Sequence, residues 1–308
     1  MPLSPQELKA RMATGLLSFP VTHFDDALKF APQPYQDHVS WLASYDAATL
    51  FAAGGTGEYF SIGQDEFPGI IRAAVEATDG RCPVVAGCGV NTARAIVDAQ
   101  AAEAAGADGL LLLPTYLMAG TQAGQMAHVK AVCQSVSIGV VVYNRATSVL
   151  TPDSVARLAE ECPNLIGFKD GVGEIDLVTR MRTMLGDRLV YVGGMPTHEL
   201  FAAAYDAAGF STYSSAVFNF VPELALKFYA AMRAGDRAVM DDILKNFFYP
   251  FAHIRDRVPG YPVSLIKGGL HAVGREAGAV RPPLSAATDK DIEDLAAVIE
   301  SSGLAVAA

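Results

Sequence analysis

The sequence is short of charged residues. Only 18% of its 308 residues are charged and 51% are hydrophobic, whereas about a quarter are charged in an average soluble domain. Disorder requires the opposite balance, low hydrophobicity and high charge, so a disordered chain is excluded. A chain of this length can bury most of the surface that its unfolded form would expose. We therefore expect a folded protein with a large core.

Basic residues are in the minority among the charges that are present. The chain has 23 Lys and Arg residues against 33 Asp and Glu, a net charge of −10. A protein that binds nucleic acid needs a basic surface to displace counterions from the phosphates. We therefore expect no nucleic-acid partner. An anionic small molecule stays possible, because a few local donors can outweigh a mildly acidic surface.

Cysteine and clustered histidine are also scarce. The four cysteines, Cys82, Cys88, Cys133 and Cys162, show no C-x-x-C spacing, so we expect reduced, mostly buried thiols in a cytoplasmic protein. The six histidines are scattered and form no H-x-x-x-H pattern. No metal site is predicted, which argues against a metal-dependent aldolase.

Long hydrophobic runs are absent as well. The longest uncharged run, 109–127, contains Pro114, Gln122 and Gln125 and indicates a strand, a loop and a helix. A membrane span would need about 20 predominantly apolar residues. The first residues, MPLSPQELKARMATG, lack the apolar core of a signal peptide. The expectation is a cytoplasmic protein with no membrane span.

What the sequence does contain is a repeated alternation of short apolar runs and amphipathic segments. The runs are rich in Val, Leu and Phe and bounded by Gly, Pro or Asn, as buried parallel strands are. Gly106 and Gly186 lie where helices should stop, and Thr151-Pro152-Asp153 marks a helix start. The predicted strands are 16–24, 48–55, 82–89, 109–114, 139–144, 165–170, 189–194 and 209–215, and the predicted helices between them are 35–46, 64–78, 92–105, 121–134, 152–161, 174–186 and 197–207.

Eight strands, each followed by a helix, predict an α/β protein with a (β/α)8 TIM barrel. A doubly wound open sheet is the alternative, but it usually has a Gly-rich phosphate loop after its first strand, where this chain has FPVTHF. Residues 1–220 would form the barrel. Residues 221–308 would form a C-terminal helical extension packed on it, with helices at 221–233, 236–256, 261–275 and 289–302.

In such a barrel the reacting groups lie at the C-terminal ends of the strands. Lys169 ends the apolar strand LIGFKD, where loss of solvent can lower the pKa of the amine and make it a nucleophile toward ketones. The alternative is a solvent-facing lysine paired with Asp170. Tyr143 ends the preceding strand, about 4.8 Å away, and could relay protons, unless it is an ordinary core aromatic.

Two loops carry polar groups near the same end. The loop GGTGEYF (54–60) leaves backbone N–H groups open, which suits a carboxylate or phosphate, although it could be a generic turn. It is neither GxGxxG nor a P-loop. The segment TYSSAVFN (212–219) supplies hydroxyls and an amide near the end of the eighth strand, or serves only as a turn.

Together, GGTGE after the second strand, YN closing the fifth and GFKD closing the sixth resemble the dihydrodipicolinate synthase / N-acetylneuraminate lyase family. The resemblance runs from FPVT (19–22) through the eighth strand. It implies a (β/α)8 enzyme that forms a Schiff base with 2-keto acids and needs no separate cofactor. Lys169 would form the imine and Tyr143 would shuttle protons. Gly55, Thr56 and Gly57 would hold the carboxylate next to the ketone.

Departures from the better-known members of the family favour one subdivision. The usual G-T-T-G-E has Gly55 in place of its first threonine, which interrupts a tyrosine relay through Tyr116. Arg145 stands close to where a proline usually follows YN, and could pair with a distal carboxylate or form only a surface ion pair. The resemblance also places Gly193, in GGMPT, and Ser214, in TYSSAVFN, at the substrate.

The segments LLSFPVTHF, VYNR, GFKDG and TYSSAVFNFVP resemble a subdivision that dehydrates and decarboxylates a keto-dicarboxylate. The expected partners are therefore this small molecule and further copies of the chain, as a dimer or tetramer. Three alternatives remain open. They are an aldolase of the same family, a nicotinamide oxidoreductase, which the missing phosphate fingerprint disfavours, and a non-catalytic sugar-acid binding protein.

Overall fold

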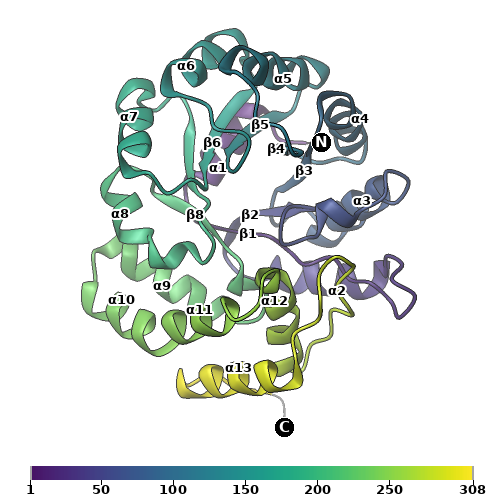
Figure 1. Cartoon of the computed structure of the whole chain (residues 1–308), viewed down its shortest axis with the longest axis vertical. Coiled ribbons are helices and arrows are strands. Elements are labelled where there is room, and N and C mark those ends of the chain that lie inside the picture. The colour runs from purple at the N-terminus through teal and green to yellow at the C-terminus, as the bar shows by residue number, and fades with distance from the viewer. Residues whose placement is uncertain (1, 307–308) are drawn as a thin grey trace.

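The structure, a computed structural model that describes residues 2–306, is a closed barrel of eight parallel strands (Figure 1). Each strand pairs with the next along the chain, and β1 also pairs with β8. The (β/α)8 prediction is therefore confirmed, and the open doubly wound sheet is excluded because this sheet has no free edge. The strands are β1 (Leu16–Ser18), β2 (Ala47–Ala52), β3 (Val84–Val90), β4 (Gly109–Thr115), β5 (Gly139–Asn144), β6 (Leu165–Asp170), β7 (Val190–Gly193) and β8 (Thr212–Ser215).

Helices connect successive strands and surround the barrel. Asn91, Thr121 and Thr151 cap three of them, because each side chain accepts a hydrogen bond from a backbone N–H of the first turn. The predicted helix 197–207 is instead a 3-10 turn followed by a short helix. These connecting elements are α2 (Pro32–Leu42), η1 (Tyr59–Ser61), α3 (Phe67–Thr78), α4 (Thr92–Ala104), α5 (Gln122–Ser135), α6 (Pro152–Glu161), α7 (Ile175–Leu185), η2 (His198–Leu200) and α8 (Ala202–Ala207).

A helix that the strand-and-helix pattern did not predict precedes the barrel. α1 (Pro5–Met12) begins at Ser4, whose hydroxyl and backbone N–H exchange hydrogen bonds with Glu7 in a capping box. Leu8 and Met12 are fully buried and belong to the same apolar cluster as the inward-facing strand residues. α1 therefore packs against the barrel interior, at the end opposite the carboxyl ends of the strands.

The C-terminal helices gather on one side of the barrel (Figure 1). The predicted helix 236–256 contains a π-helical turn, and Pro250, which has no N–H to donate, follows that turn closely. Phe220, just after β8, packs its ring 6.2 Å from that of Phe251. The elements after β8 are η3 (Val217–Asn219), α9 (Pro222–Ala234), α10 (Arg237–Ile243), η4 (Leu244–Phe248), α11 (Tyr249–Arg255), α12 (Tyr261–Ala272) and α13 (Asp289–Ser301).

The barrel interior is a packed apolar core that includes Phe51, Val85, Leu111, Val141 and Val192. A second, larger core fills the space between the strands and the helices. Within residues 2–306, no helix is both long and apolar enough to cross a membrane.

The pairing of β5 with β6 is irregular, and this irregularity sets the position of Lys169. The register shifts between Val140 and Val141, so that Ile166 is skipped and Gly167 lies opposite Val141. Such a bulge re-aims the residues that follow it. Beyond the bulge Lys169 lies directly opposite Tyr143.

Candidate active site

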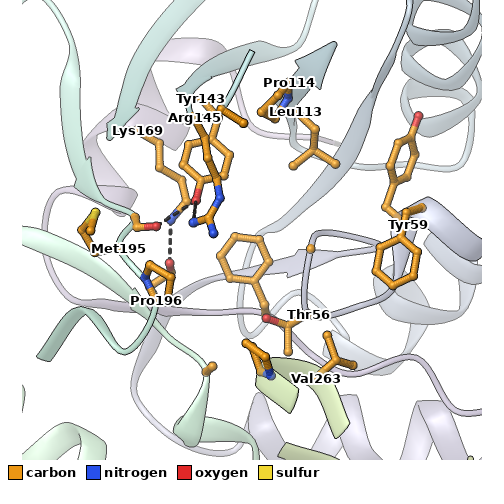
Figure 2. A pocket seen from close by; sticks show the side chains of 18 of the residues that line it. Thr56, Tyr59, Leu113, Pro114, Tyr143, Arg145, Lys169, Met195, Pro196 and Val263 are labelled. Carbon is orange, nitrogen blue, oxygen red and sulfur yellow. Dashed lines mark hydrogen bonds between the residues drawn. The ribbon is translucent and has the colours of Figure 1, made fainter. Parts of the chain in front are cut away.

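A cavity of about 580 Å³ opens at the carboxyl ends of the strands (Figure 2). The strands and the loops after them supply most of its wall, and α11 and α12 supply the rest. Phe19 lines the cavity and stacks on Phe51 of the barrel interior with ring centroids 4.7 Å apart, which gives this part of the wall an apolar surface. Such a largely apolar cavity with a few polar groups is the usual form of a small-molecule site.

Lys169 is the central polar group of this cavity. Its side chain is only 2% exposed, and its Nζ donates hydrogen bonds to Ser214 Oγ at 2.7 Å and to the Gly193 carbonyl at 3.3 Å. Burial, aided by the positive charge of Arg145 and opposed by Asp170, lowers the pKa of Lys169 to about 7. A large share of the amine is therefore neutral and nucleophilic at neutral pH.

Lys169 has no carboxylate partner among residues 2–306. Asp170 points away from it, since its Oδ2 accepts hydrogen bonds from the Tyr205 hydroxyl at 2.5 Å and from the Gly173 N–H at 3.1 Å. The alternative of a solvent-facing Lys169–Asp170 pair is therefore wrong. A directly paired lysine would have kept its proton.

Tyr143 lies beside Lys169, with the lysine Nζ 4.9 Å from the centre of its ring. Its hydroxyl donates to the Gly194 carbonyl at 2.8 Å and accepts from Arg145 Nη1 at 3.2 Å, as Figure 2 shows for the arginine. Burial raises the pKa of Tyr143, and the nearby Arg145 partly offsets this rise. The phenol is therefore protonated at neutral pH and placed to give or return a proton near the lysine.

Arg145 follows β5 and lies in the cavity wall, so it is not a remote surface residue. It makes no ion pair with an acid among the described residues, and its one side-chain hydrogen bond goes to Tyr143. The remaining N–H groups of its guanidinium are therefore available to an anion in the cavity. The surface ion pair considered for Arg145 is not formed.

The Gly-rich loop after β2 contributes backbone groups. Gly55 and Thr56 line the cavity, and no acceptor within residues 2–306 takes the N–H groups of Thr56 and Gly57. Gly57 itself lies behind the wall, where its carbonyl accepts from the Thr22 hydroxyl at 2.6 Å. A Cβ at Gly57 would come within 3.1 Å of the Pro20 carbonyl oxygen, so the close packing of this position favours glycine.

Of the other two predicted residues, Ser214 lines the cavity and Gly193 does not. Gly193 lies behind Lys169, to which it offers its carbonyl, and a Cβ there would come 2.1 Å from Nε2 of the buried His198. Its neighbour Gly194 takes the place in the wall.

Other residues of the cavity wall were not predicted from the sequence. Thr197 follows β7 in the segment GGMPT, of which only Gly193 was predicted to lie at the substrate, while Arg255 and Ile266 come from the C-terminal helices, where no local pattern points to a site.

Lys169, Arg145 and Arg255 are the three basic residues of the wall, and among the described residues that form it there is no Asp or Glu. Asp256 pairs with Arg255 from outside the wall, so Arg145 is the guanidinium that an anionic ligand can approach.

The Gly-rich loop after β2 is tied to the C-terminal helices by a buried ion pair. Glu58, fully buried, lies with its Oε1 2.8 Å from Nζ of Lys267 on α12, and its Oε2 accepts from the Arg281 N–H at 2.9 Å. Lys267 also donates to the Ala279 carbonyl at 2.8 Å. The C-terminal helices and the segment between them therefore fix the position of the loop after β2, which faces the cavity.

Metal ligands are not gathered in this cavity. Across residues 2–306, no group of three or more His, Cys, Asp or Glu residues is arranged to hold a metal ion. The four cysteines are buried free thiols.

Comparison with known proteins agrees with this geometry. The model of the dihydrodipicolinate synthetase family matches residues 12–302. The chain belongs to this family. The segment that the family model covers runs from the end of α1 to the end of α13, so the C-terminal helices are part of the family's architecture.

Named relatives within the dihydrodipicolinate synthetase family are similar over nearly their whole length. A probable 5-dehydro-4-deoxyglucarate dehydratase of Rhizobium rhizogenes is 59% identical over 300 residues, which cover 97% of this chain and 99% of that protein. A protein of the same name from Rhizobium meliloti is 57% identical over 300 residues, with the same coverage.

Solved structures share the family fold. Dihydrodipicolinate synthase from Bacillus clausii superimposes with a TM-score of 0.88 at 23% identity and covers 96% of this chain and 100% of its own. YagE, a prophage protein of the same family from E. coli K12 in complex with pyruvate, superimposes with a TM-score of 0.83 at 25% identity and covers 95% of this chain and 99% of its own.

Proposed function

We propose that the protein is a 5-dehydro-4-deoxyglucarate dehydratase that releases CO2 and water and forms 2,5-dioxopentanoate through an imine on Lys169. The observation that carries the proposal is a buried lysine without a carboxylate partner, in a wall that holds two arginines and no acid. The names of relatives at 59% and 57% identity support the choice of substrate.

The first half of the reaction follows from the position of the amine. Neutral Lys169 attacks the ketone and expels water, and the resulting imine makes the neighbouring CH2 acidic. Removal of that proton gives an enamine, which expels the hydroxyl one carbon farther along as water. Tyr143 is the proposed proton shuttle, because its hydroxyl lies beside the lysine and is hydrogen-bonded to Arg145.

The second half uses the conjugated imine as an electron acceptor. The bond to the distal carboxylate breaks, CO2 leaves, and the electron pair moves toward the imine nitrogen. Reprotonation and hydrolysis by one water then release the dioxo acid and the free lysine. The lysine imine supplies the electron sink that pyridoxal phosphate would otherwise provide, so we propose that no separate cofactor is used.

Each carboxylate of the substrate has a proposed partner. Gly55 and Thr56 line the cavity, and the open N–H group of Thr56 is the proposed donor to the carboxylate next to the ketone, while Gly57 shapes the loop from behind. Arg145 offers its unpaired N–H groups to the distal carboxylate before it is lost, and Ser214 holds the amine in place through its hydrogen bond.

Trapping the imine tests the proposal directly. The protein is incubated with pyruvate or substrate and reduced with borohydride, and its tryptic peptides are weighed. We expect one adduct, on Lys169, and the same adduct in a Lys227→Met control, whose lysine is exposed on α9. No adduct, or an adduct elsewhere, contradicts the covalent mechanism.

The products separate the dehydratase from an aldolase of the same family. A dehydratase releases CO2 and a dioxo acid from 5-dehydro-4-deoxyglucarate, whereas an aldolase releases pyruvate by breaking a carbon–carbon bond. We expect CO2 in an amount equal to the substrate consumed and no pyruvate. Pyruvate release would assign the aldolase reaction instead, and a sugar-acid binding protein would give neither product.

We further propose that the enzyme works in the cytoplasm as a homo-oligomer, a dimer or tetramer. The four buried free thiols support a reducing compartment. Tyr116, Leu117 and Met118 support the oligomer, because they are 73%, 71% and 72% exposed and form an apolar surface that a second copy would cover. Analytical ultracentrifugation tests this, and a monomer at micromolar concentration would contradict it.

A further inference from the structure

Thr197 is one of four non-glycine residues of the cavity wall with a positive φ, and Val90, Leu117 and Ala146 are the others. Thr197 follows β7 with φ 49° and ψ 63°, in the left-handed region. A β-branched residue is a genuine outlier there, since its side chain crowds the backbone. Such a conformation persists only where the surroundings enforce it, and it is found preferentially at functional sites.

The side chain of Arg255 fixes the hydroxyl of Thr197. Arg255 is the last residue of α11, its side chain is 11% exposed, and its Nη1 hydrogen-bonds Thr197 Oγ1. A guanidinium can only donate, so Thr197 Oγ1 must accept this bond. The hydroxyl proton of Thr197 is then free, and no acceptor for it lies within the described part of the chain.

Arg255 is itself already neutralised. Its Nε and Nη2 donate to the two carboxylate oxygens of Asp256, at 2.8 and 2.9 Å. These two parallel hydrogen bonds form the bidentate geometry that a guanidinium and a carboxylate prefer. Arg255 is therefore not a free cation for the ligand, in contrast to Arg145, and acts on the cavity through the hydroxyl that it holds.

The other donors of the cavity already have proposed partners at the two ends of the substrate. Lys169 takes the ketone, the loop after β2 takes the adjoining carboxylate and Arg145 takes the distal carboxylate, so the hydroxyl-bearing carbons between them have no assigned donor. We propose that Thr197, positioned by Arg255, donates a hydrogen bond to this hydroxylated half of the substrate and so helps select it; this assignment rests on the proposed function.

Two variants at Thr197 distinguish the effect of its hydroxyl group from the effect of its side-chain shape. Thr197→Val keeps the β-branched shape at the strained position and removes the donor, while Thr197→Ser keeps the donor. We expect kcat/KM for 5-dehydro-4-deoxyglucarate to fall about 10- to 100-fold in Thr197→Val, as for loss of a hydrogen bond to a charged or reacting group. Thr197→Ser should recover most of this loss. Thr183→Val, on the exposed face of α7, is the matched control and should match the wild type.

Pyruvate supplies the second readout, because it contains the ketone and its carboxylate but lacks the hydroxylated half. Borohydride trapping of pyruvate on Lys169 should proceed in Thr197→Val within about twofold of the wild-type rate, since this hydrogen bond is worth nothing to pyruvate. Equal losses with pyruvate and with the full substrate would show a general disturbance of the site and overturn the assignment.

Arg255 is tested as a positioning residue. Arg255→Met should lower kcat/KM for the full substrate, and the Thr197→Val/Arg255→Met double variant should be no worse than the poorer single variant, because both act through one hydroxyl. Additive losses would show that Arg255 acts elsewhere.

The wild type distinguishes failure of this assignment from failure of the proposed function. If the wild type releases no CO2 from the substrate, the proposed function falls, and this assignment falls with it. If the wild type releases CO2 and Thr197→Val does so equally well, only the role of Thr197 is overturned.

Discussion

Two buried lysines, one in the cavity wall and one next to a wall residue on α12, have different roles. Lys169 on β6 and Lys267 on α12 are 2% and 6% exposed, and each ammonium lies near an aromatic ring. Burial is the first cause of a lowered pKa in both. The difference lies in their partners. Lys169 meets a hydroxyl and a carbonyl, whereas Lys267 meets the carboxylate of Glu58 at 2.8 Å.

The comparison teaches that the partner, and not burial alone, decides the chemistry of a buried amine. Without a counter-charge, the pKa of Lys169 falls to about 7 and the amine becomes a nucleophile. Glu58 opposes the fall in the pKa of Lys267 and holds its amine in an ion pair at 2.8 Å. We therefore expect Lys169 to matter for turnover, and Lys267 to matter for stability and for the shape of the Gly-rich loop after β2.

The largest expected effect comes from Lys169→Met. Turnover should fall by at least about 10⁴-fold, as expected when a covalent nucleophile is removed. The free energy of unfolding should not decrease, because the substitution replaces a poorly paired buried amine with an apolar side chain of similar length. Steady-state kinetics and urea unfolding measure the two quantities. A variant that loses stability as well as turnover would break the contrast with Lys267.

Lys267→Met should show the reverse pattern. It leaves Glu58 buried without its partner, so we expect a loss of about 3–5 kcal/mol in the free energy of unfolding. Adding Glu58→Gln to Lys267→Met should recover part of that loss, because the uncompensated charge is then removed. Urea unfolding of the single and double variants provides the measurement. Unchanged stability in the single variant would mean that the ion pair is not a structural cross-link.

Tyr143→Phe sharpens the comparison, since it removes the hydroxyl beside Lys169 and leaves the ring. We expect kcat to fall about 10²-fold, in the range for loss of a positioned proton shuttle. The pyruvate adduct on Lys169 should still form, because the nucleophile is intact. A decrease in kcat of less than about threefold would assign the proton transfers to another group.

The pH dependence gives the smallest but most specific effect. The rate of imine formation with pyruvate should rise as pH increases and level off above about 7, because only the neutral amine of Lys169 attacks. Arg145 lowers this pKa, so in Arg145→Met the same rise should shift to higher pH. The charged and titratable groups around the amine are Arg145, Asp170, Tyr143 and His198, although Asp170 points away from it. A profile that Arg145→Met leaves unmoved would show that the two charges are not coupled.

Much of the site could be predicted because a short stretch of sequence is enough to identify the end of a strand. Lys169 and Tyr143 each end an apolar run, and the parallel register that places them side by side follows from the barrel. The glycines were harder to interpret. Gly55 lines the cavity, but Gly57 and Gly193 serve close packing behind it, and the sequence alone does not distinguish a glycine that faces a ligand from one that leaves room for a neighbour.

The rest depends on contacts between distant parts of the chain. Ile266 and Arg255 enter the wall only because the C-terminal helices fold back over the strand ends, which no local pattern indicates. The capping sequence of α1 was present from Ser4 to Glu7, but its packing against the barrel interior depends on the closed sheet. The strained backbone of Thr197 is likewise invisible in its sequence.

The ion pair between Glu58 and Lys267 also affects the order in which parts of the molecule fold. It joins residues 209 positions apart, and the neighbouring bond from Arg281 to Glu58 spans 223. Contacts between such distant residues form late, because the ends of a long loop must first be brought together. During synthesis the loop after β2, which lines the cavity, would emerge early, but these contacts could hold it in place only after residue 281 has been made. A newly made chain would therefore complete this part of the cavity late.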